Sequence, residues 1–133
     1  MASVAQKNAL SVRIDLAASA TTDGMEATLS VRNARGEIVP GIYCLEAWIS
    51  ESSTGAGLTA DSYSGTVTAS TGTILTAFTA KKHFSVMTAS SGIAVLLAVD
   101  SANPTDQYVA AKSPNTGLVH VSAVSGTNWQ GAA

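Results

Sequence analysis

The sequence predicts an all-β domain of short antiparallel strands. Three observations lead to this prediction. No long stretch repeats apolar residues every three to four positions, as an amphipathic helix would. Short apolar and β-branched runs recur instead, separated by clusters of Gly, Ser, Thr, Asn and Asp. In residues 25–32 apolar and polar side chains alternate without a break, which is typical of a strand with one buried face.

The first half of the chain contains three expected strands, at 9–16, 25–32 and 42–50. The first two alternate cleanly and are joined through Asp23-Gly24, a dipeptide that favours a turn. A second turn is expected at 33–36, where Gly36 ends the segment. Pro40-Gly41 then breaks the chain before the third strand.

The second half contains more strand-like segments, each with β-branched or aromatic residues that favour extended structure. They lie at 64–69, 73–80, 83–88, 93–99, 107–111 and 118–124. Segment 93–99 (IAVLLAV) is the most apolar, so we expect it at the centre of a sheet. About seven to eight strands in one domain indicate a β-sandwich or a small barrel, of which we favour the sandwich.

Composition narrows the class of protein. Charged residues make up only 12% of the 133 residues and hydrophobic residues 46%, which fits one folded domain with few surface charges. Such a surface suits a protein packed against neighbours. The formal net charge is −2, and Lys81-Lys82 is the only pair of adjacent basic residues, so we expect no nucleic-acid binding. Neither a signal peptide nor a membrane-spanning stretch is recognisable, which predicts synthesis in a cytoplasm without membrane insertion.

No catalytic or metal-binding motif stands out. The two histidines, His83 and His120, lie far apart in the sequence, and His120 is expected on the surface or between subunits. Cys44 is the only cysteine and is expected to be a small buried residue. The acidic loop 100–106 lacks the order of a calcium loop, and an Asx-type turn around Pro104 is the better interpretation. We therefore expect a non-enzyme without cofactor or metal.

Trp48 is the most informative single residue. On 42–50, Tyr43, Leu45, Ala47 and Ile49 share one face, while Glu46 and Trp48 share the other. Because an unpaired buried carboxylate is costly, the first face is the better core candidate. Trp48 and Glu46 would then point outward to a subunit interface. The alternative is a bulge that turns Trp48 into the core.

The two ends of the chain are polar and small, and they predict an N-terminal arm at 1–8 and a tail at 126–133 around a domain at 9–125. Alone, both ends should be mobile. Trp129 is the only large apolar residue of the tail. We expect it to anchor a latch that reaches a neighbouring subunit or the shell of an assembly. The alternatives are a frayed terminus or a Trp129 that folds back onto its own domain.

Three segments carry a family resemblance: 30–55 (SVRNARGEIVPGIYCLEAWISESSTG), 64–99 (SGTVTASTGTILTAFTAKKHFSVMTASSGIAVLLAV) and 106–124 (DQYVAAKSPNTGLVHVSAV). They follow an R-x-x-x-G-x-x-V-x-G turn, a W-I-S-D/E strand and a T-x-x-x-G turn before an apolar strand. In this order and texture the chain resembles the Ig-like structural modules of tailed bacteriophages.

The resemblance implies an Ig-like antiparallel β-sandwich and a place in a virion. The leading expectation is a capsid decoration (cement) protein on the outer shell that binds the major capsid protein, its own copies, or both. The alternative is a tail or fibre adhesin that binds a host cell-surface carbohydrate. The family supplies no catalytic residue to transfer to this chain.

Overall fold

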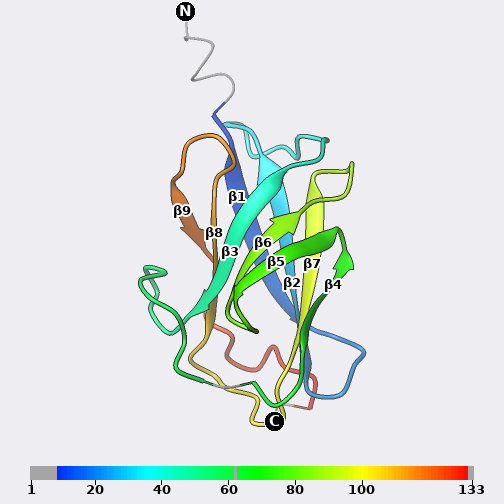
Figure 1. Ribbon diagram of the computed structural model, residues 1–133, viewed down its shortest axis with the longest axis vertical. Helices are drawn as coiled ribbons and strands as arrows, with labels where there is room; N and C mark the ends of the chain where they lie inside the picture. The colour runs from blue at the N-terminus through cyan, green and yellow to red at the C-terminus, as the bar shows by residue number, and fades with distance from the viewer. Residues whose placement is uncertain (1–8, 62, 132–133) are drawn as a thin grey trace, which may run out of the picture.

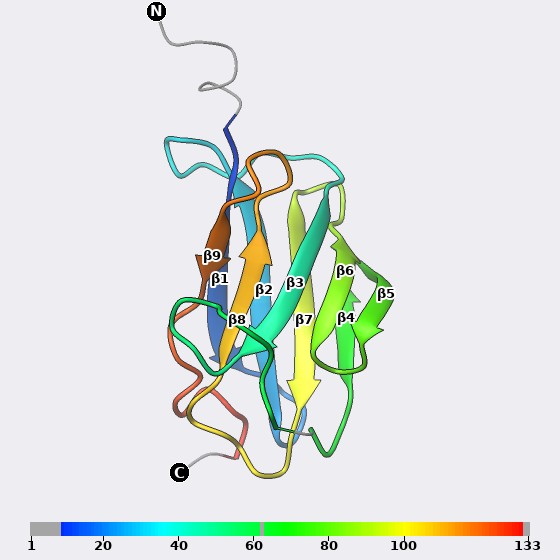
Figure 2. The same cartoon turned by 60° about the vertical axis from the view of Figure 1, so that its left-hand side comes forward.

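Two antiparallel sheets face each other in the computed structural model, which describes residues 9–61 and 63–131 (Figures 1 and 2). The four-stranded sheet runs β1 (Ser11–Ala18), β2 (Gly24–Arg32), β7 (Ile93–Val99), β4 (Val67–Thr71). The five-stranded sheet runs β5 (Thr73–Thr79), β6 (His83–Met87), β3 (Cys44–Ser50), β8 (Tyr108–Lys112), β9 (Val119–Val121). The described residues form no helix. The all-β prediction is confirmed, and the architecture is a β-sandwich.

Nine strands form, one on each of the nine segments expected from the sequence, against an estimate of about seven to eight. Gly72 is the single residue between β4 and β5, where the chain passes from one sheet to the other. Its φ of +76° belongs to the left-handed region that glycine enters without strain. The two expected segments 64–69 and 73–80 therefore become edge strands of opposite sheets.

Alternation along the strands builds the core. Val12 and Ile14 of β1 and Met25, Ala27, Leu29 and Val31 of β2 point inward against Leu45, Ala47 and Ile49 of β3. β7 lies between β2 and β4, as its apolar sequence predicted. Ala94, Leu96 and Ala98 of β7 are buried, while its alternate residues are only half buried on the outer surface.

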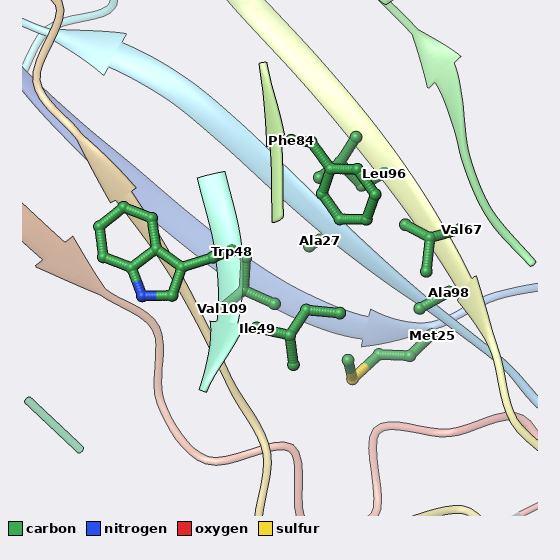
Figure 3. Close-up of a pocket in the computed structure, with 9 residues that line it drawn as sticks. All are labelled: Met25, Ala27, Trp48, Ile49, Val67, Phe84, Leu96, Ala98 and Val109. Carbon is green, nitrogen blue, oxygen red and sulfur yellow. The ribbon is translucent and has the colours of Figure 1, made fainter. Parts of the chain in front are cut away.

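Many small residues fill the space between the sheets. Figure 3 shows Met25, Ala27, Phe84, Leu96 and Ala98 around an internal cavity of about 10 Å³. A space of this size holds one water molecule at most, and its apolar walls offer a water no partner. The interior is therefore a packed core and no ligand site.

The C-terminal tail packs against the sandwich in its described part. Asp23 N donates to Gln130 O at 2.9 Å, and Gln130 N donates to Gly24 O at 2.8 Å. Residues 126–131 thus pair with the turn before β2, in place of the mobile tail expected from the sequence. The predicted arm at 1–8 and the last two residues of the tail lie outside the described residues.

Candidate functional site

The outer faces of the two sheets differ in the number of their charged side chains. On the four-stranded sheet, Arg13, Asp15, Glu26 and Arg32 alternate with core residues and therefore face outward. On the strands of the five-stranded sheet the outward positions carry one carboxylate, Glu46, and one ammonium group, Lys112. These two groups pair with each other, so the described part of this face has almost no net charge.

An open groove of about 280 Å³ lies on this low-charge face. Strands β3, β6, β8 and β9 form its floor, and the loop 51–59 that follows β3 forms one wall. Its lining residues are Glu46, Trp48, Gly55, Gly57, Leu58, His83, Lys112 and Val119. Apolar and charged side chains thus share one shallow depression.

Glu46 is the polar centre of the groove. Its Oε2 lies 3.4 Å from Lys112 Nζ and 3.3 Å from His83 Nε2. The contact with His83 has an ion-pair distance but not the alignment of a hydrogen bond, and Nε2 is buried without a hydrogen-bond partner among the described residues. These half-exposed contacts contribute little to stability. Their effect is to balance charge in the groove.

Trp48 lies on the outer face, as the strand parity predicted, and Figure 3 shows its indole on the opposite side of β3 from the core residues. Yet the residue is only 8% exposed, because loop 51–59 folds over it. Trp48 Nε1 donates to Gly55 O at 2.8 Å, and Gly55 is packed against the sheet. Trp48 is thus neither part of the main core nor an open interface residue; it holds the wall of the groove.

Exposed hydrophobic side chains surround the groove. Leu58 and Val119 form part of its rim, and Phe78 of β5 lies beside it, with its ring centre 4.8 Å from that of His83. Farther along the same sheet Ile42, Cys44 and Leu75 are also exposed. Cys44 was expected to be buried; the correction follows from its parity, since it shares the outward face of β3 with Glu46 and Trp48.

Trp129 folds back onto its own domain, which was the alternative to the latch predicted from the sequence. The side chain is 1% exposed and belongs to the core cluster. Its Nε1 donates to Pro104 O at 2.7 Å, and its ring meets Tyr63 edge to face at 5.6 Å. In this conformation Trp129 cannot reach a neighbouring subunit.

Two other predicted features are settled by hydrogen bonds and register. In loop 100–106, Asp100 Oδ1 accepts from Ala102 N at 3.1 Å, which is an Asx turn at the start of the loop rather than around Pro104, where the sequence predicted it. His120 was expected on the surface, but it pairs with Ala111 on the core side of its sheet and is half buried. Burial lowers the pKa of His120.

Glu46 and Trp48 were predicted from the sequence as surface contact residues. The other residues in or beside the groove were not predicted as site residues: His83, Lys112, Leu58, Val119 and Phe78. These residues come together only through the strand order β5-β6-β3-β8-β9, which no local pattern reveals. The exposure of Phe78 could not be predicted from simple alternation, because it depends on the bulges in β5.

No family model matches the chain, and no curated protein or solved structure matches it either. The described residues include no helix long and apolar enough to cross a membrane. Nor do they contain a group of three or more His, Cys, Asp or Glu side chains arranged to hold a metal ion.

Proposed function

We propose that the chain is a structural binding protein that attaches to neighbouring protein subunits through the outer face of its five-stranded sheet. The observation that supports this proposal is the difference between the two faces. The face of the five-stranded sheet exposes Ile42, Leu75, Phe78, Leu58 and Val119, while its strands carry a single, internally paired set of charges. Depletion of charge and enrichment in apolar anchors are typical of the centre of a protein interface.

Burial of these side chains would supply the binding energy. Each Å² of apolar surface removed from water contributes about 25 cal/mol, so several half-exposed Leu, Ile and Phe residues can together contribute several kcal/mol. Part of this gain offsets the loss of motional freedom on association. Repetition over many equivalent positions of an assembly would multiply the stabilisation without any single tight contact.

The partner we propose is the shell of a tailed bacteriophage, where the chain would act as a decoration (cement) protein. This assignment depends on the resemblance of segments 30–55, 64–99 and 106–124 to phage Ig-like modules. The exposed apolar side chains Leu58 and Val119 at the rim of the groove support binding to a protein surface.

A carbohydrate-binding adhesin is the second candidate, and the groove is the observation in its favour. Glu46 and Lys112 offer an acceptor and a donor beside an aromatic side chain, a combination that suits sugar hydroxyls and ring faces. The loop over Trp48 leaves little of its indole open for stacking, which favours the protein partner. Binding to immobilised glycans, lost in Lys112→Ala, would support the adhesin instead.

The experiment that tests the proposal has two parts. Mass spectrometry of virions purified from the host that carries the gene should detect the chain in a fixed ratio to the major capsid protein. Particles that lack the chain should then bind added wild-type protein, but bind Phe78→Asp much more weakly. Ile38→Asp places the same charge at an exposed residue of the β2–β3 connection and serves as the matched control. Absence from virions, or equal binding of both variants, would contradict the proposal.

A further inference from the structure

Phe78 is turned out of the sheet by an irregularity in β5. In the pairing of β5 with β6 the register shifts twice, between Ile74 and Thr76 and between Ala77 and Thr79. The residues skipped by these shifts are Leu75 and Phe78, which are also the two exposed large hydrophobic residues of the strand. Bulges commonly re-aim a side chain in this way. Phe78 is 59% exposed as a result, so most of the residue stays open to a further partner although its ring contacts His83.

The groove lies directly beside this ring. Phe78 contacts His83, and His83 is one of the lining residues of the groove. A buried apolar cavity of about 150 Å³ is known to accommodate benzene, so a depression of about 280 Å³ has room for one phenyl ring. An exposed aromatic side chain and an unfilled depression of matching size therefore stand next to each other on one face.

From this juxtaposition we infer that two copies of the chain bind face to face, with Phe78 of each copy inserted into the groove of the other. A two-fold axis exchanges neighbouring features of one surface, so a knob beside a hole is self-complementary. The inserted ring would contact Leu58, Val119 and the stem of Lys112, and its face would lie near the ammonium group. The inference rests on the proposed role of this face and commits to a second copy as the occupant of the groove; a second copy and a shell would compete for Phe78.

Charge and strand geometry both agree with a second copy. Because Glu46 and Lys112 neutralise each other, two such faces can meet without bringing net like charges together. β5 is an edge strand, and its two bulges make this edge irregular. An irregular edge opposes strand pairing with the edge of another sheet. Both features favour side-chain packing between faces as the mode of contact.

The available area suits a dimer of modest affinity. Strands about 4.8 Å apart and about five residues long on average give the five-stranded face a projected area of roughly 400 Å². Loop 51–59 adds to this, and a standard interface buries about 800 Å² per partner. We therefore expect a dimer that forms with increasing concentration.

The test uses two variants that damage opposite halves of the contact. Phe78→Ala removes the knob and keeps the groove; Leu58→Arg fills the groove and keeps the knob. Sedimentation velocity should show that each variant alone raises the dimer Kd by at least about 100-fold, roughly tenfold for each of two lost contacts. Both variants should keep the wild-type melting temperature, since both positions are exposed. Ile38→Ala, at an exposed site outside the groove, should dimerise normally.

A mixture of the two variants decides the mode of binding. The mixed pair retains one intact contact, the Phe78 of the Leu58→Arg chain in the groove of the Phe78→Ala chain. Its Kd should therefore lie about tenfold below that of either variant alone. A wild-type chain that stays monomeric at millimolar concentration, or a mixture no better than its components, would overturn the inference. If Phe78→Asp still loses particle binding in either case, the proposed attachment to a shell stands and only self-association fails.

Discussion

At the scale of single residues, Trp129 is the side chain whose position matters most for stability. It fills core space, pairs edge to face with Tyr63 and donates to Pro104 O. We predict that Trp129→Ala lowers the free energy of unfolding by about 3–5 kcal/mol, measured by urea denaturation. Gln130→Ala is the matched control, because Gln130 is exposed and its backbone bonds to Asp23 and Gly24 survive the change. A loss below about 1 kcal/mol for Trp129→Ala would show that the tail does not contribute to the fold.

His120 predicts a pH dependence of stability. Burial lowers its pKa in the folded state, and its buried Nε2 has no hydrogen-bond partner among the described residues. Below the unfolded pKa of about 6.5 the unfolded chain binds the proton more readily, so stability is complete above this pH and falls as the pH drops toward the folded pKa. His120→Gln should flatten the melting temperature between about pH 7 and 5. An unchanged slope in this variant would assign the effect to other groups.

At the scale of elements, the loop over Trp48 depends on close contact between backbone and sheet. A Cβ added at Gly55 would lie 3.2 Å from Ala110 Cβ and 3.2 Å from Val121 Cγ2, whereas a Cβ at Gly57 would meet nothing within 4 Å. Both glycines have positive φ, so alanine costs about 1 kcal/mol of conformational strain at either site. Gly55→Ala should therefore destabilise more than Gly57→Ala in thermal unfolding, and it should increase quenching of Trp48 fluorescence as the loop lifts. Equal effects at the two positions would contradict this packing.

The elements also show what the sequence could and could not reveal. The strands with one buried face, above all β2, were predictable because alternation records burial directly. The sheet switch at Gly72 and the bulges at Leu75 and Phe78 were not, since they change the face of a residue without changing the local pattern. Trp48 combined both cases: parity placed it on the outer face, but its cover comes from a loop whose path depends on tertiary contacts.

At the scale of the whole molecule, the two faces of the sandwich have different characters. Arg13 and Asp15 form an exposed ion pair on the four-stranded sheet, where charged side chains keep the surface hydrated. The five-stranded sheet instead gathers Phe78, Leu75 and Ile42 around a neutral groove. Under the proposed function, the four-stranded face would stay in water and the five-stranded face would bind a neighbouring subunit.

Attachment through the five-stranded face can be tested most directly at Cys44, because the only cysteine of the chain is exposed on this face. The rate of its reaction with a thiol reagent should be measured on free chain and on chain attached to purified virions. A control places the only thiol on the other face, as Thr28→Cys in a Cys44→Ser background. If the chain attaches through its five-stranded face, attachment should slow the reaction of Cys44 at least tenfold and leave the reaction of the control thiol unchanged. Equal reactivity of Cys44 in both states, or protection of the control thiol alone, would contradict attachment through this face.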